Sequence, residues 1–314
     1  MQRPQQQAAR PLYWTRTEFL FHCHFKIKIP LFYPENILDE LFEEIKRIDK
    51  LYNSFQPQSY FWKVNQQAGD WVNVDQTTIA LLNRTIEMSD YFNGQYDISI
   101  TPLLRLWHFF DEEKKYIPKE YEILEILDKV NYKNIEINHD KVKIAKGMEL
   151  TTGSFLKSFA VDCIVDQIKN KYKITDALIN AGGSTIYAIN DDTHPYWKVN
   201  IPDISNQKEN LATIKLSNTS INISAQNLSF VEINATQFGH IIHPKTGQPS
   251  TNKQVAVITE NACSGDMLST GLLCMTDNIK DTMENLEEKY QASSLLIDST
   301  NKEYASSKFS TYKL

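Results

Sequence analysis

The 314-residue sequence has few cysteines, no excess of basic charge and no long apolar run. Its four cysteines, Cys23, Cys163, Cys263 and Cys274, lack the paired spacing of a zinc site or a redox dithiol, so we expect free thiols. The 33 basic and 39 acidic side chains give a formal charge of -6, which argues against a nucleic-acid partner. No stretch is long enough for a transmembrane segment, and residues 1–17 lack the apolar core of a signal peptide.

The apolar pattern mixes hairpins with strand–helix units, so it predicts an α+β fold rather than a doubly wound sheet. We expect a poorly ordered extension over residues 1–17 and a single domain over residues 18–314, because no repeat or linker interrupts the chain. Strands are predicted at 19–29, 177–180, 197–201, 212–216, 220–224 and 255–259, with a hairpin at 135–144. Helices are predicted at 34–51, 75–93, 121–129, 155–172, 266–275 and 278–290.

The residues that indicate most about chemistry are His240, Asp266 and Thr270. His240 is a titratable imidazole beside the tight turn of GHIIHPKTGQP. Asp266 and Thr270 lie one turn apart on one helix face, where a carboxylate and a hydroxyl suit Mg²⁺. Alternatively, Asp266 is only a helix N-cap and Thr270 a core residue. A further alternative is that His240 and His243, together with Asp266, bind zinc.

Four other segments carry candidate ligand contacts, each with a structural alternative. Phe55, in a polar turn, is suited to stacking on a flat heterocycle, or it packs on the core. Asp97 is suited to accepting donors from a ligand, or it shapes an Asx-type turn. Lys157 stands at a helix start that favours phosphate, or it is solvated. Gly182 and Gly183 allow a close backbone approach, but no GxGxxG fingerprint or Walker loop occurs in the chain.

Six blocks taken in order resemble the FAD:protein FMN transferases, the ApbE-like flavin transferases. They span Phe19 to Cys274: a polar turn with Ser59 and Asn65, GQYDISITPLLRLW, GSFLKSFAVD, NAGGS, HIIHPKTGQP and SGDMLSTG. The resemblance implies two interwoven subdomains of mixed, largely antiparallel sheet with packed helices. It also implies FAD as donor, Mg²⁺ as cofactor, and transfer of FMN to a threonine or serine hydroxyl of a target flavoprotein, with release of AMP.

Carried over by position, the resemblance assigns His240 as the catalytic histidine. It assigns Asp266 and Thr270 as magnesium ligands and places Ser154 at a further metal contact. The positions that match cofactor-binding residues are Phe55, Tyr96, Asp97, Thr151, Lys157, Gly182, Gly183 and Ile241.

Three departures from the family pattern are Thr151 and His243, where acids are expected, and Ser158, where a glycine is expected. Losing acids near a diphosphate weakens magnesium binding or reshapes the flavin site. The departures therefore keep an alternative open: an FAD-binding protein without transferase activity, or an FAD pyrophosphatase that gives FMN and AMP. The aromatic, strand-rich composition leaves a third reading, an extracellular structural or carbohydrate-binding protein.

Overall fold

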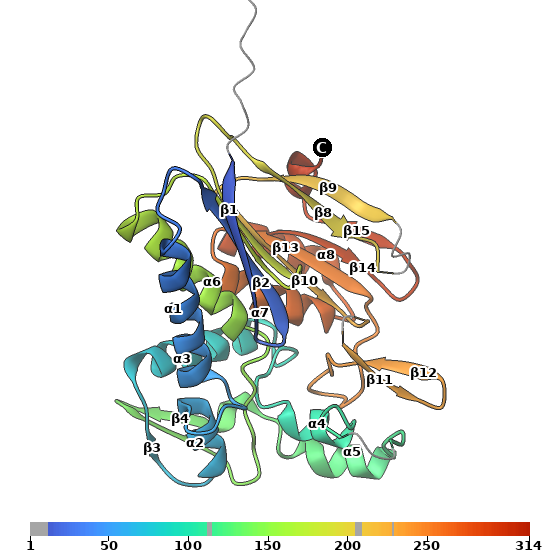
Figure 1. Cartoon of the computed structure of the whole chain (residues 1–314). Coiled ribbons are helices and arrows are strands. Elements are labelled where there is room, and N and C mark those ends of the chain that lie inside the picture. The colour runs from blue at the N-terminus through green and yellow to red at the C-terminus, as the bar shows by residue number, and fades with distance from the viewer. Residues whose placement is uncertain (1–11, 112–114, 205–208, 228) are drawn as a thin grey trace, which may run out of the picture.

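The structure is a computed structural model that describes residues 12–111, 115–204, 209–227 and 229–314. Its centre is an eight-stranded antiparallel sheet with the order β1-β2-β6-β7-β10-β13-β14-β15 (Figure 1). Its strands are β1 (Tyr13–Leu20), β2 (Cys23–Pro30), β6 (Ala177–Ala181), β7 (Thr185–Ile189), β10 (Thr219–Ala225), β13 (Gln254–Thr259), β14 (Ser293–Ile297) and β15 (Glu303–Ala305). Together with the packed helices, this sheet confirms the predicted α+β class.

Both faces of the central sheet are buried. Along β13, Val255 and Val257 pack towards the helices, while Ala256 and Ile258 pack towards a hairpin on the other face. This alternation follows from the period of two along a strand, and it explains why β13 is apolar throughout. The helices of the first face are α1 (Ile37–Tyr52), α3 (Gln76–Tyr91), α6 (Leu156–Asp166, continuing as a π-helical turn Gln167–Lys171), α7 (Ala262–Leu273) and α8 (Ile279–Tyr290). The opposite face is covered by β8 (Trp197–Pro202), β9 (Asn210–Leu216) and the 3-10 turn Phe309–Tyr312.

Two of the chain's excursions from the central sheet come together beside it, which interweaves the parts of the chain. The first excursion, between α1 and α6, forms a three-stranded sheet and short helices (Figure 1). Its elements are α2 (Tyr60–Gln66), β3 (Val72–Asn73), α4 (Thr101–Leu106), α5 (Glu120–Leu127), the 3-10 turn Tyr132–Asn134, β4 (Ile135–Asn138) and β5 (Lys141–Ile144). The second excursion is the hairpin β11 (Phe230–Ile233) and β12 (Thr236–Gly239), followed by the turn at 243–249.

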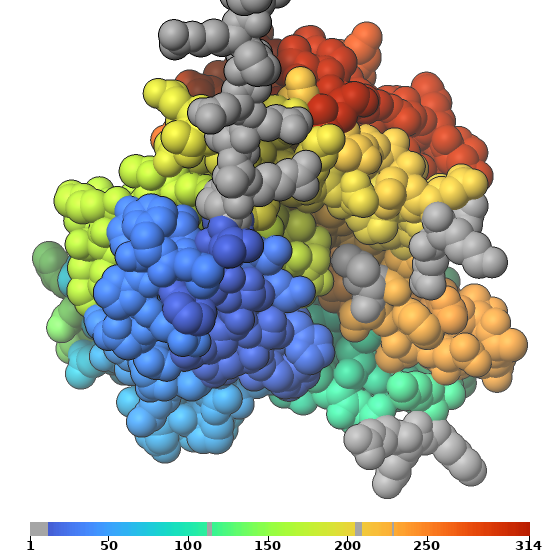
Figure 2. Space-filling view, turned by 45° about the horizontal axis from the view of Figure 1, so that its top comes forward, coloured from blue at the N-terminus to red at the C-terminus, as the bar shows by residue number. Residues whose placement is uncertain are grey.

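The two excursions contact each other through Trp107. Its indole Nε1 donates to the carbonyl oxygen of Gly247 at 2.7 Å, and its ring packs with Leu103, Ile123 and Ile242. Figure 2 shows the blue N-terminal hairpin and the orange β11–β12 hairpin on one face of the molecule, with the teal α4–α5 segment between them. Segments from the start, the middle and the end of the chain therefore meet at one place.

Three sequence-based expectations differ from the structure. The strand predicted at 19–29 is a hairpin that turns at Phe21 and His22, so that residues 13–17 pair in β1 instead of forming an extension. Helix α7 begins at Ala262, capped by the side chain of Asn261, which accepts from the Ser264 N–H at 2.9 Å. Asp266 therefore lies inside the helix, and the N-cap alternative for it is wrong. Within the described ranges, no helix combines the length and apolar character needed to cross a membrane.

Candidate active site

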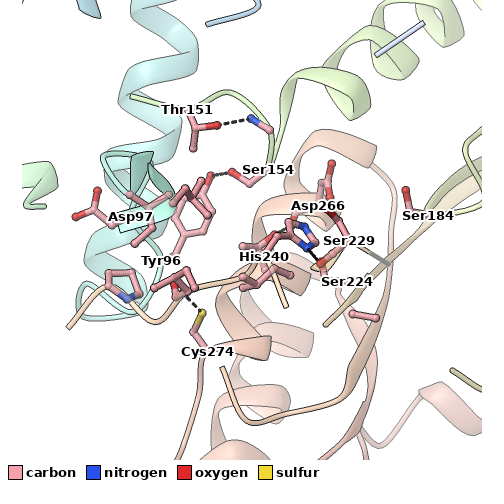
Figure 3. Close-up of a pocket in the computed structure, with 18 of the residues that line it drawn as sticks. Tyr96, Asp97, Thr151, Ser154, Ser184, Ser224, Ser229, His240, Asp266 and Cys274 are labelled. Atoms are coloured by element: carbon pink, nitrogen blue, oxygen red, sulfur yellow. Dashed lines mark hydrogen bonds between the residues drawn. The ribbon is translucent and has the colours of Figure 1, made fainter. Parts of the chain in front are cut away.

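A cavity of about 350 Å³ opens where the two excursions meet the central sheet (Figure 3). This volume lies within the range of small-molecule sites. Nine of the twelve predicted site residues line it: Tyr96, Asp97, Thr151, Ser154, Lys157, His240, Ile241, Asp266 and Thr270. The fold therefore gathers into one hollow an imidazole, a carboxylate, a lysine and several hydroxyls that lie far apart in the sequence.

His240 follows β12 and has a defined tautomer. Its Nδ1 lies 3.0 Å from the carbonyl oxygen of Ser229, and the two residues are joined in Figure 3. Because a carbonyl only accepts, the proton of the neutral ring is on Nδ1, and Nε2 keeps its lone pair. Burial lowers the pKa of His240 below its usual value of 6.5; the bond to Ser229 opposes this, and the charge of Lys157 adds to it. The ring is therefore a neutral proton acceptor at pH 7.

Asp266 and Thr270 present oxygens to the cavity from successive turns of α7. Ser158 Oγ donates to Asp266 Oδ2 at 2.5 Å, whereas Asp266 Oδ1 makes no hydrogen bond within the described part of the chain. Thr270 donates its hydroxyl proton to the Asp266 carbonyl oxygen at 2.9 Å, which leaves its oxygen lone pairs available. Burial raises the pKa of Asp266, opposed by Lys157 and by the bond from Ser158. A bound cation offsets this cost of burying a carboxylate.

Ser154 contributes a further hydroxyl, which lies 3.0 Å from the phenol oxygen of Tyr96. In Figure 3, Tyr96 and Ser154 lie on one side, with His240 and Asp266 on the other. One carboxylate and two hydroxyls match the chemistry of Mg²⁺, which takes few protein oxygens and keeps water and phosphate as other ligands. The residues present therefore fit the magnesium site that the sequence predicts.

The zinc alternative does not fit the structure. His243 lies in the turn outside the cavity wall, where its Nδ1 accepts from the backbone N–H of Lys245 at 3.2 Å. Among the residues that the structure describes, no group of three or more His, Cys, Asp or Glu side chains gathers as metal ligands do. His243 is thus a hydrogen-bonded turn residue. It does not join His240 in a two-histidine zinc site.

Lys157 stands in the first turn of α6 with its Nζ hydrogen-bonded to Ser184 Oγ. A cation there opposes the helix dipole, so its presence favours an anion nearby. Thr151, one loop earlier, also lines the cavity, but its hydroxyl accepts from the Gly153 N–H at 3.2 Å. Lys157 therefore supplies the positive charge of the site, while Thr151 shapes the loop.

Asp97 lines the wall, yet its carboxylate is occupied within the protein. Oδ1 accepts from the backbone N–H and the hydroxyl of Ser99 at 2.8 and 2.7 Å, and Oδ2 accepts from the Tyr132 N–H at 2.8 Å. Burial raises the pKa of Asp97, and these bonds oppose the rise. This is the Asx-type turn of the structural alternative, which positions the neighbouring Tyr96.

The structure does not bring three predicted residues into the cavity. The ring of Phe55 is 45% exposed and packs on Phe110, with 5.1 Å between ring centroids. Gly182 and Gly183 form the turn between β6 and β7, on a separate depression beside the β1–β2 hairpin. A Cβ on Gly182 meets Cys23 Cβ at 2.7 Å, and its φ of +69° favours glycine. These glycines therefore serve the turn that directs Ser184 into the cavity.

Sequence reasoning missed several residues of the cavity wall. Phe21, at the tip of the β1–β2 hairpin, supplies the cavity with an aromatic side chain of the kind that was expected from Phe55. Ser184 and Ser224 also line the wall, and Ser224 exchanges a hydrogen bond with Ser269 at 2.8 Å. The NAGGS block could have predicted Ser184 as a wall residue, because this polar residue directly follows the glycine pair.

Comparisons with known proteins give matches over most of the chain. A model of the ApbE family matches residues 21–294. A FAD:protein FMN transferase of Vibrio cholerae serotype O1 is 25% identical over 286 residues, which cover 88% of this chain and 83% of the relative. A protein of the same name from Haemophilus influenzae is 21% identical over 291 residues, covering 89% of this chain and 83% of the relative.

Solved structures share the fold. The crystal structure of the ApbE protein from Thermotoga maritima superposes with a TM-score of 0.88 at 22% identity, covering 96% of this chain and 100% of the other. The flavin transferase ApbE from Vibrio cholerae has a TM-score of 0.81 at 20% identity, covering 96% and 99%. The interwoven arrangement described above is therefore the one these structures have.

Proposed function

Because the chain belongs to the ApbE family, as its sequence blocks predicted, we propose that it transfers the FMN moiety of FAD to a hydroxyl of a target protein. The relatives that carry the name FAD:protein FMN transferase match more than four-fifths of this chain. The observation that carries the proposal is that a neutral His240, the oxygens of Asp266 and Thr270, and Lys157 all line one cavity.

In this proposal FAD is the donor substrate, and a threonine or serine of a partner flavoprotein is the acceptor. His240 Nε2 takes the acceptor hydroxyl proton while that oxygen bonds to the FMN phosphorus. The bond from this phosphorus to the oxygen bridging to AMP breaks, and AMP leaves with the bond electrons. Lys157, at the N-terminus of α6, orients and neutralises the phosphates.

Magnesium is the proposed cofactor, held by Asp266 Oδ1, Thr270 and Ser154. When bound, Mg²⁺ offsets the negative charge that builds up on the diphosphate. The flat rings of the substrate lie against the apolar wall, where Phe21 and Tyr96 are the aromatic side chains. Asp97 and Thr151 act by shaping this wall.

The test is incubation of the purified chain with FAD, Mg²⁺ and a flavoprotein that carries an acceptor threonine. We expect a covalently fluorescent acceptor and one AMP per flavin transferred, both lost in His240→Ala. An acceptor that stays unlabelled across several flavoproteins, with an intact fold, contradicts the proposal.

A second candidate function is favoured by Thr151, which stands where the family pattern has an acid and whose hydroxyl accepts from Gly153. Without that acid the protein either binds FAD without catalysis or hydrolyses it to FMN and AMP. Measuring AMP with and without acceptor separates these cases. Equal AMP release without acceptor indicates a pyrophosphatase, and a yellow protein that releases no AMP indicates a binding protein.

A further inference from the structure

The buried hydroxyl of Ser158 contacts Asp266 from the side away from the cavity. Ser158 lies on α6 with 0% exposure, and its Oγ donates to Asp266 Oδ2 at 2.5 Å. We infer that Ser158 is a positioning residue, which fixes the Asp266 carboxylate so that Oδ1 faces the cavity as a ligand for Mg²⁺. The inference rests on the magnesium site of the proposed function. It gives a role to Ser158, which in the sequence was only a departure from the family's glycine.

Ser158 is itself held by two buried residues on neighbouring strands. Asn222 Nδ2 on β10 donates to Ser158 Oγ at 3.2 Å and to Thr185 Oγ1 at 3.1 Å. Thr185 Oγ1 on β7 lies 3.0 Å from Ser158 Oγ. Ser158, Thr185 and Asn222 all have 0% exposure, so water does not compete for these bonds.

The protons of this network run in one direction, towards Asp266. Ser158 has one hydroxyl proton, and a carboxylate only accepts, so that proton points at Asp266. The hydroxyl proton of Thr185 is then the one shared with Ser158. The Asn222 amide donates one proton to Ser158 and the other to Thr185, and these two bonds fix its orientation. Every donor is satisfied when Asp266 is ionised, which is the form that a cation needs.

Without Ser158, Asp266 Oδ2 loses its hydrogen-bond donor, and among the described residues no other hydrogen bond to the carboxylate sets its rotation. Partners behind a metal ligand of this kind typically contribute about 10–100-fold to metal affinity. We expect that magnitude for Ser158, because Asp266 is the only carboxylate among the proposed ligands.

The experiment compares Ser158→Ala with Ser89→Ala in the full chain. Ser89 is a matched control, since it is a buried helix serine on α3 whose Oγ donates to the Thr85 carbonyl oxygen at 2.8 Å. Calorimetric titration with Mg²⁺ in the presence of FAD gives the metal affinity, and flavin fluorescence quenching without metal gives the FAD affinity. We expect Ser158→Ala to weaken Mg²⁺ binding about 10–100-fold and to leave metal-free FAD binding within about twofold. Ser89→Ala leaves both affinities unchanged.

Thr185→Val provides a second variant that keeps the side-chain shape and removes the hydroxyl. It weakens Mg²⁺ binding as well, but adds no further loss to Ser158→Ala, because both act through the same bond to Asp266. Unchanged Mg²⁺ affinity in folded Ser158→Ala or, if that variant does not fold, in Thr185→Val overturns the inference and leaves the proposed function intact. If the native chain binds no Mg²⁺ and is indistinguishable from Asp266→Asn, both the inference and the proposed magnesium-dependent function are wrong.

Discussion

Asn65 on α2 connects the outer helix to the loop that carries Thr151 and Ser154. Its Nδ2 donates to the Leu150 carbonyl oxygen at 2.8 Å, and its Oδ1 accepts from the Leu150 N–H at 2.7 Å. Leu150 is fully buried. Asn65→Ala leaves both backbone groups unpaired, which costs about 1–3 kcal/mol for each. Alanine is a better helix former than asparagine and stabilises α2 by about 0.5 kcal/mol. We therefore expect the free energy of unfolding to fall by about 2–5 kcal/mol.

The assay is urea unfolding followed by tryptophan fluorescence, with a lower midpoint at an unchanged slope. Asn83→Ala is the control, because Asn83 is an exposed asparagine within α3, and we expect a change within about 0.5 kcal/mol. Since Leu150 precedes the cavity loop, FAD affinity falls in Asn65→Ala as well. A loss of stability below about 1 kcal/mol in Asn65→Ala refutes the reasoning that these two bonds hold the loop.

Three further predictions concern the cavity and the helix beneath it. Burial lowers the pKa of His240 below 6.5, and a base must be neutral, so kcat/KM falls only as the pH drops below 6.5; a fall that begins above pH 7 contradicts this assignment. Burial raises the pKa of Asp266, so the charged carboxylate destabilises the metal-free fold at pH 7, and Asp266→Asn should keep or raise the metal-free Tm while abolishing the rise on adding Mg²⁺. Gly265→Ala places a Cβ 2.3 Å from Asn222 Oδ1 and 2.6 Å from Thr259 Oγ1; we expect a loss of about 1–3 kcal/mol in urea unfolding, and an unchanged midpoint shows that α7 shifts freely.

Elements with strong local signals could be predicted from the sequence. Asp75 caps α3 as expected, accepting from the Thr78 N–H at 2.8 Å. The hairpin at 135–144 turns at His139, whose φ of +54° suits the Asn-His-Asp turn. In contrast, the hairpin turn at Phe21 and His22 has positive φ at both residues but no glycine or asparagine, so no local signal marked it.

In the cavity, too, residues within recognisable sequence blocks could be predicted, whereas residues brought in by strand pairing could not. The ordered sequence blocks allowed three site residues to be predicted, and all three line the cavity: His240, Asp266 and Thr270. The role of Phe21 could not be predicted, because the sequence placed Phe21 inside a strand at 19–29 and only the structure shows it in a turn. Only the antiparallel pairing of β2 with β6 brings the Phe21 turn beside the loop at Ser184. Tertiary pairing of this kind leaves no trace in a single sequence.

The cavity wall extends from Phe21 to Cys274 along the chain. During synthesis, a ribosome-bound chain that has released only its first 250 or so residues lacks α7 and hence the carboxylate of Asp266. Under the proposed function, the magnesium site cannot assemble before α7 has been synthesised, so a product that ends before Ala262 should lack transferase activity. The interwoven path of the chain thus makes completion of the cavity wall depend on α7, one of the last helices to be synthesised.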